Sequence, residues 1–198
     1  MRSRFLEQRE LNALRSAGAS VWLPFKIALE TGLRIGDIAK IRWRDIEGNK
    51  LKYTAEKTGK RGEALLTWQT VADLRRLHAN STSIWVFPSP RRAGRHITRQ
   101  TLWYRFKRAA RRAQIPLGGA SPHSLRKVYA VREFRAHGAR AASAALQHKN
   151  LATTEIYIFS DWATGENAKL PLLREDIPRL CQIMEDLLIS KISKNAKK

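Results

Sequence analysis

The sequence of 198 residues has a single cysteine, Cys181, and only 17 acidic residues. One thiol can form neither an intrachain disulfide nor a multi-thiolate zinc site, so both kinds of cross-link are excluded. No apolar run approaches the length that crosses a bilayer, and the N-terminal residues lack the apolar core of a signal peptide. We therefore expect neither membrane insertion nor secretion, and a cytoplasmic location.

Basic residues are abundant, because Lys and Arg together number 38 and the formal net charge is +21. The hydrophobic content of 43% is that of a globular protein rather than a disordered one. Cations that neutralise phosphates release condensed counterions, so this charge predicts binding to nucleic acid. On charge alone, a ribosomal-type protein or a merely soluble basic protein remains open.

The positive charge is concentrated between residues 91 and 114, where there is no Asp or Glu and where Trp103, Tyr104 and Phe106 lie among the cations. Arginine predominates there, and its planar fork matches a phosphate group. The cations of this stretch are Arg91, Arg92, Arg95, Arg99, Arg105, Lys107, Arg108, Arg111 and Arg112. We expect this stretch to contact DNA.

Helical spacing of apolar residues, together with capping residues and glycine stops, indicates a largely helical chain. Ser20, Thr70, Thr98 and Ser121 are the expected N-caps, and Pro122 suits a first helical position. The predicted helices cover residues 7–17, 20–30, 35–43, 70–78, 98–113, 121–136, 139–146, 152–158 and 176–190.

A β-hairpin interrupts the helices. Leu51, Tyr53 and Ala55 alternate with polar residues, 64–67 is a second short apolar run, and the glycine-containing, lysine-rich stretch 56–62 lies between them. The predicted fold class is therefore mainly α with a small antiparallel sheet, α+β.

The helix predicted over 98–113 has two unlike faces. Leu102, Phe106, Ala109 and Ala113 form an inner face, which leaves most of its arginines on the outside, where a phosphate backbone would meet them. Together with Lys60 at the hairpin tip, the predicted DNA-binding residues are Arg99, Arg105, Arg108, Arg112 and Lys60.

Four short motifs stand out by their order along the chain. Taken singly, each has a plain explanation: a helical His-x-x-Arg such as His123 and Arg126 is usually a surface pair, and lysines in a turn usually add solubility. Their joint occurrence in this order favours one shared site. The motifs are TGLRIGD at 31–37, EKTGK at 56–60, PHSLR at 122–126 and LQHKNLATTEIY at 146–157.

With these motifs, the chain resembles the tyrosine recombinases, the phage integrase family, through most of its first 165 residues. Lys57 is the better match to the hairpin lysine, with Lys60 second. Three positions depart from the usual pattern: Asp37 stands where Glu is common, Lys127 where His is frequent, and Gln147 where Gly is customary. The resemblance implies a tyrosine recombinase catalytic fold and the catalytic residues Arg34, Lys57, His123, Arg126, His148 and Tyr157.

The resemblance also implies roles for these residues. Tyr157 would attack a DNA phosphate and leave a 3′-phosphotyrosine and a free 5′-hydroxyl. Arg34 and Arg126 would stabilise the charge of the transition state, and Lys57 would protonate the departing oxygen. The histidines, His123 and His148, would donate hydrogen bonds or take the proton of the nucleophile. No carboxylate cluster or histidine pairing suits a metal, so we expect neither metal, other cofactor nor ATP.

The predicted function is thus a site-specific DNA recombinase or integrase. A type IB topoisomerase or a telomere resolvase is a second enzyme alternative, because both share the phosphotyrosine chemistry. A DNA-binding module that does not cleave DNA is the alternative that is not an enzyme. The expected partners are double-stranded DNA and, for the full-length protein, further copies assembled on DNA as a dimer or tetramer.

The organisation expected from the resemblance is a catalytic domain over 1–165 and a helical tail over 166–198. The 176–190 helix of that tail would dock on its own domain or on a neighbouring protomer. Because Arg34 lies so near the start, we expect the family's N-terminal core-binding domain to be absent from this chain.

Overall fold

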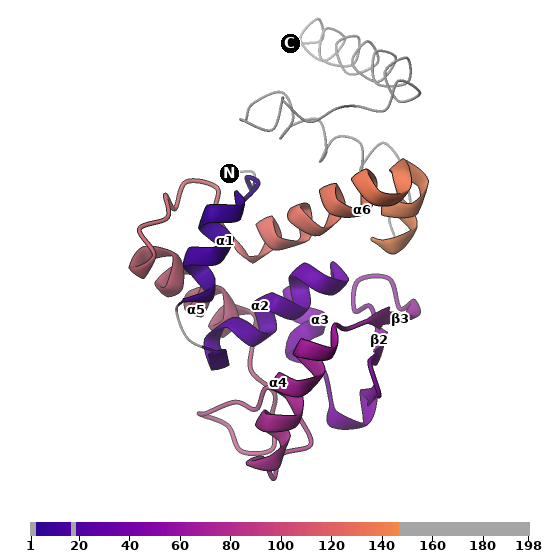
Figure 1. Ribbon diagram of the computed structural model, residues 1–198. Coiled ribbons are helices and arrows are strands. Elements are labelled where there is room, and N and C mark those ends of the chain that lie inside the picture. Colours follow the sequence, from indigo (N-terminus) through magenta and orange to yellow (C-terminus); the bar gives the residue numbers. More distant parts are fainter. Residues whose placement is uncertain (1–2, 17–18, 147–198) are drawn as a thin grey trace, which may run out of the picture.

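The computed structural model describes residues 3–16 and 19–146 of the chain (Figure 1). Within these ranges the fold is helical with one small sheet. The helices are α1 (Gln8–Arg15), α2 (Ala19–Thr31), α3 (Ile35–Ala39), the 3-10 turn η1 (Trp43–Asp45), α4 (Trp68–Ala79), α5 (Arg99–Arg112) and α6 (Pro122–Ala145). The antiparallel sheet has the order β1 (Ile46–Glu47), β2 (Lys50–Thr54), β3 (Arg61–Leu65).

Helix α2 lies at the centre of the fold and contacts the five other α-helices and strand β3. Its sequence is apolar on nearly every side, which is the pattern of a helix that is buried all round. Phe25 packs edge-on against Phe106 of α5, with ring centroids 5.5 Å apart. Because α6 and α3 both pack on α2, the residues that these two helices carry come close together in space (Figure 1).

The sheet confirms the predicted hairpin but shifts its second strand. Strand β3 spans Arg61–Leu65 rather than 64–67, because Ala55 N–H donates to the Lys60 carbonyl at 2.8 Å and closes the turn early. The register pairs Leu51 with Ala64 and Tyr53 with Gly62. Strand β1, which the sequence analysis missed, adds only two residues to the edge.

The helix predicted over 35–43 ends earlier, at Ala39. The chain beyond it is extended because it pairs with a distant segment: Val86 N–H donates to the Ile41 carbonyl at 3.0 Å, and Arg42 forms a bridge with Trp85. Backbone groups that pair with a distant segment of the same chain are not available for the hydrogen bonds of a continuing helix.

Two predicted N-caps are wrong. Helix α2 already begins at Ala19, so Ser20 lies inside it. Helix α4 begins after Thr67, whose hydroxyl accepts the N–H of Thr70 at 3.3 Å, so Thr70 lies in the first turn instead of capping it. Glu30 of α2 accepts hydrogen bonds from both threonine hydroxyls, at 2.8 and 2.7 Å, and this fixes where α4 starts.

Helices α5 and α6 begin where the sequence predicts. Thr98 caps α5 by accepting the Thr101 N–H at 3.1 Å, and Pro122 occupies the first turn of α6. Helix α6 is broken at Gly138, whose φ of 81° is not helical; this matches the two helices predicted on either side of that glycine.

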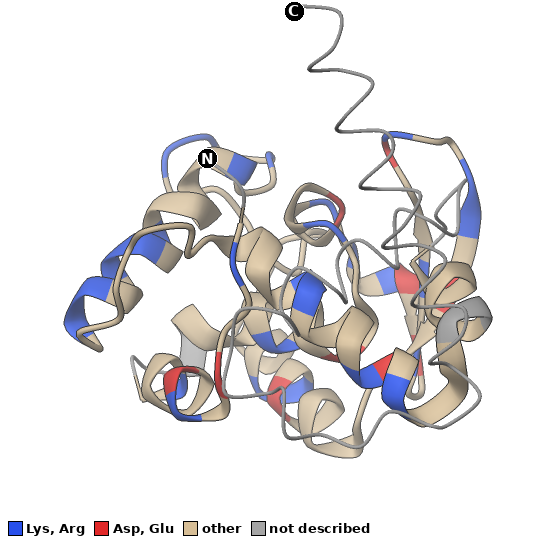
Figure 2. Ribbon diagram, turned by 90° about the horizontal axis from the view of Figure 1, so that it is seen from above, with Lys and Arg blue, Asp and Glu red and all other residues tan. Residues whose placement is uncertain are grey.

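The predicted helices over 152–158 and 176–190, and with them His148 and Tyr157, lie outside the described residues. Within the described ranges, no helix combines the length and the apolar character needed to cross a bilayer. Figure 2 shows that Lys and Arg far outnumber Asp and Glu over the ribbon, as the net charge requires.

Candidate functional site

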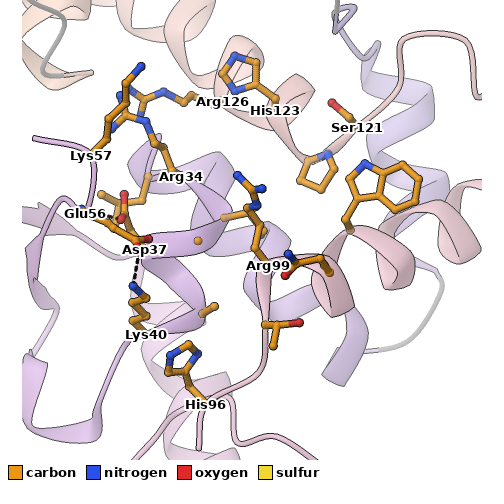
Figure 3. A pocket seen from close by; sticks show the side chains of 18 of the residues that line it. Arg34, Asp37, Lys40, Glu56, Lys57, His96, Arg99, Ser121, His123 and Arg126 are labelled. Carbon is orange, nitrogen blue, oxygen red and sulfur yellow. Dashed lines mark hydrogen bonds and ion pairs between the residues drawn. The ribbon is translucent and has the colours of Figure 1, made fainter. Parts of the chain in front are cut away.

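A pocket of about 920 Å³ opens where α3, the hairpin tip, α5 and the start of α6 meet (Figure 3). Four side chains predicted as catalytic line it: Arg34, Lys57, His123 and Arg126. They come from three separate motifs, and Figure 3 shows Arg34, Lys57 and Arg126 converging at one end of the pocket. The predicted DNA-binding residue Arg99 lines the same pocket.

Arg34 lies at the N-cap of α3, directly after the turn that ends α2. That turn requires glycine at position 32 for two reasons: φ is +65°, and a Cβ built there would lie 2.2 Å from Cδ1 of Tyr129 on α6. The close approach of the Gly32 backbone to α6 brings Arg34 and α6 together.

Arg126 is the most firmly held of these cations. It is only 6% exposed, and its guanidinium donates to two main-chain carbonyls, those of Gly32 and of Leu146, the latter at 2.6 Å. The guanidinium therefore joins the end of α2 to the end of α6. Because the two carbonyls fix its position, it needs little rearrangement to meet an anion in the pocket.

His123 lies in the first turn of α6, and its imidazole keeps an exposed surface toward the pocket. The pKa of His123 is lowered to about 4, first by desolvation from the surrounding protein and then by the positive charges of Arg126, Lys127 and Arg34. Its ring is therefore neutral at pH 7, with one nitrogen able to accept a proton and the other able to donate a hydrogen bond.

Lys57 is carried by the hairpin tip, which is anchored to α3. Asp37 is buried, and its Oδ1 accepts the Glu56 N–H at 3.0 Å. Lys40 forms an ion pair with the Glu56 carboxylate at 2.6 Å, and this hydrogen bond lowers the pKa of Glu56. Glu56, the residue next to Lys57, is thus held at its main chain by Asp37 and at its side chain by Lys40; Figure 3 shows the Lys40 contact.

Two further basic side chains line the pocket, although no sequence motif singled them out as site residues. Lys40 and His96 lie at the end remote from Arg126 (Figure 3). The His96 Nδ1 lies 2.6 Å from the carbonyl of Ile97, which orients the ring. Lys40 follows α3 directly, whereas His96 is more than 50 residues further along the chain, so no local pattern brings the two together.

The remaining predicted DNA-binding residues lie outside this pocket. Arg105 and Arg108 line a second pocket of about 490 Å³, together with Arg91. Burial lowers the pKa of Arg105, and the neighbouring Arg108 lowers it further, so an anion bound here would relieve repulsion between two guanidinium groups. Arg112 and Lys60 are exposed and line neither pocket.

Comparison with known proteins gives the chain its family. The model of the phage integrase family matches residues 4–163, which is most of the chain. The chain belongs to the phage integrase family. The matched range includes the sequence positions of His148 and Tyr157 and covers most of the catalytic domain expected over 1–165.

Curated relatives and solved structures agree with this assignment. Tyrosine recombinase XerD of Vibrio cholerae is 34% identical over 138 residues, which are 64% of this chain and 45% of the relative. The crystal structure of XerA recombinase superposes with a TM-score of 0.70 at 20% identity, over 85% of this chain and 63% of that one. The crystal structure of a lambda integrase dimer bound to a COC′ core site superposes with a TM-score of 0.67 at 21% identity. The match covers 87% of this chain and 51% of the integrase chain.

These likenesses confirm the predicted fold class, a mainly helical catalytic domain with a small antiparallel sheet. The chain spans less than half the length of the XerD proteins that it matches.

Proposed function

We propose that this chain is the catalytic domain of a site-specific DNA recombinase or integrase, which cleaves and rejoins DNA through a 3′-phosphotyrosine. One observation carries the proposal: Arg34, Lys57, His123 and Arg126 line a single pocket although they come from motifs far apart in sequence. Family membership and similarity to the XerD recombinases support it.

The scissile phosphate would lie between Arg34 and Arg126. Negative charge on its non-bridging oxygens grows in the transition state, and fixed guanidinium groups stabilise that charge without reorganisation. The first turn of α6 also lines the pocket, so the positive end of its helix dipole adds to this field. Side chains alone can therefore supply the charge stabilisation, and we propose a reaction that uses neither metal nor ATP.

The reaction exchanges one phosphodiester for another. Tyr157 Oη forms a bond to phosphorus while the bond from phosphorus to the 5′ oxygen breaks. The phenolic proton passes to a histidine, either His123 or His148. The Lys57 ammonium gives a proton to the departing 5′ oxygen. Attack by a new 5′-hydroxyl reverses these transfers and rejoins the strands.

We propose that the duplex lies across the pocket and the outer face of α5. The predicted DNA-binding residues of α5 are Arg99, Arg105, Arg108 and Arg112, and α5 contains no acidic residue. They would contact backbone phosphates, with Lys60 reaching the DNA from the hairpin. Since a relative was solved as a DNA-bound dimer, we also propose that the full protein assembles on DNA, with the 166–198 tail contacting its own domain or a neighbour.

The test is covalent trapping on a pool of nicked duplexes whose core sequence is randomised. Cleavage beside the nick releases a short fragment, so the phosphotyrosine adduct accumulates and survives SDS. We expect an adduct that forms equally in EDTA, enriches particular core sequences and disappears in Tyr157→Phe. An adduct undiminished in Tyr157→Phe, or no adduct from any sequence of the pool, overturns the proposal. Adducts on every core sequence alike identify a topoisomerase instead.

A further inference from the structure

Two aromatic side chains stand exposed on α5 at the edge of the pocket. Trp103 is 41% and Tyr104 67% exposed. Their rings meet edge to face, with centroids 5.1 Å apart and planes at 85°. Core packing does not explain them, because α5 turns Leu102 and Phe106 toward the interior and these two toward solvent.

The pair lines two pockets, and each of these pockets also contains arginine side chains. Both rings line the pocket that contains Arg99, and Tyr104 also lines the second pocket with Arg105 and Arg108. A ligand that covers Tyr104 therefore has guanidinium groups in both adjoining pockets. This arrangement fits a flat ligand with negative groups attached on either side.

The indole ring is held in place before any ligand arrives. The Lys107 Nζ lies 5.4 Å from the centre of the Trp103 ring, and the same ammonium donates to the Leu117 carbonyl at 3.1 Å. Trp103 in turn supports the more exposed Tyr104. Such preorganisation reduces the entropy lost on binding.

A nucleobase in a sugar–phosphate strand has the required chemistry: a flat π-face and a phosphate on each side. Two rings at a right angle can contact the face of a base with one ring and its edge with the other. Within an intact duplex the neighbouring bases cover both faces of each base. Only a base that lies outside the stack can therefore contact both rings.

We propose that Trp103 and Tyr104 bind an unpaired base next to the cleaved phosphate, so that the preferred substrate is DNA with an extruded or unpaired nucleotide. This inference rests on the proposed function, which places the cleaved phosphate at Arg34 and Arg126. It deepens that function by naming the form of DNA that the site binds best.

The experiment compares two duplexes that share one strand containing a single 2-aminopurine, which the opposite strand either pairs or leaves unpaired. The full chain is titrated against each at fixed salt, and both Kd and 2-aminopurine fluorescence are measured. Stacking on an aromatic ring favours the base by about five- to 150-fold. We expect a Kd at least about fivefold lower for the unpaired duplex, and quenching of its fluorescence on binding.

The variant Trp103→Leu/Tyr104→Leu should bring the ratio of the two Kd values close to one, while Tyr104→Phe keeps the preference. The matched control is Trp68→Leu, because Trp68 of α4 is also 67% exposed but lines neither pocket. It should leave the ratio unchanged. Equal Kd values for the wild-type chain, or an equal loss on both duplexes in the double variant, overturn the inference.

The trapping assay separates this inference from the proposed function. If wild type forms the covalent adduct but binds both duplexes alike, the base site is wrong and the proposed function stands. If wild type prefers the unpaired duplex and the double variant does not, yet no core sequence gives an adduct, the base site is supported and the cleavage activity is wrong.

Discussion

The main pocket and the outer face of α5 are both cationic, but they hold their charges differently. In the pocket, Arg126 is buried and its guanidinium is fixed by the carbonyls of Gly32 and Leu146. On α5, Arg108 and Arg112 are exposed to solvent. Fixed, buried charge favours a transition state over a ground state, whereas exposed charge adds salt-dependent affinity for any phosphate backbone. The two regions should therefore respond to mutation in opposite ways.

The largest expected effect tests the fixed charge. Arg126→Ala removes a guanidinium from the proposed phosphate site, so the rate of adduct formation at saturating DNA should fall by about a thousandfold. DNA affinity should change far less. Arg108→Ala is the matched control, with a small loss of affinity and no loss of rate at saturation. Equal effects of the two variants on the rate would show that the pocket has no special role.

A second prediction concerns the turn between α2 and α3, where the Gly32 backbone approaches α6. Gly32→Ala should destabilise the fold by about 3 kcal/mol in urea unfolding, because it combines a positive φ with a clash against Tyr129. Gly48→Ala separates the two causes: Gly48 has φ +60° but nothing within 4 Å of a Cβ, so only about 1 kcal/mol should be lost. Similar losses at both positions would contradict the close approach to α6.

A third prediction tests the exposed charge. Arg105→Ala/Arg108→Ala should make the slope of log K against log salt shallower by about 2, with a loss of about tenfold or more in affinity at low salt. Adduct formation at saturating DNA should stay near the wild-type rate. Arg75→Ala, on the exposed side of α4, is the control for a general loss of positive charge. An unchanged slope would mean that this face of α5 does not contact phosphate.

The smallest expected effect is a pH dependence of stability. The pKa of His123 is about 4 in the folded chain, below the ordinary histidine value of 6.5, so the unfolded chain binds more protons between these values. The stability that the neutral ring contributes is present above pH 6.5 and is lost as pH falls toward 4. Urea midpoints at pH 7 and pH 4.5 should differ less in His123→Gln than in wild type, with His78→Gln as control. A midpoint difference in His123→Gln as large as that of wild type would contradict the lowered pKa of His123.

The N-terminal ends of α5 and α6 could be predicted because the sequence signals for a helix start are local. Thr98 and Pro122 act within one turn of their own positions, and the spacing of Leu102 and Phe106 defines the inner face. The helix predicted over 35–43 failed because its second half pairs with residues far along the chain. A hydrogen bond between segments far apart in the sequence is not visible in the spacing of neighbouring residues.

The sequence by itself determined the family, the cationic character and the candidate residues Arg34, Lys57, His123 and Arg126, because residue types at fixed spacings carry that information. The roles of these residues, and of His148 and Tyr157, stay predictions. Only the tertiary structure decided that the Gly32 carbonyl holds Arg126, that Asp37 anchors the hairpin tip, and that His96 lines the same pocket as Arg126. Each of these depends on segments distant in sequence that meet only when α2 is buried at the centre of the fold.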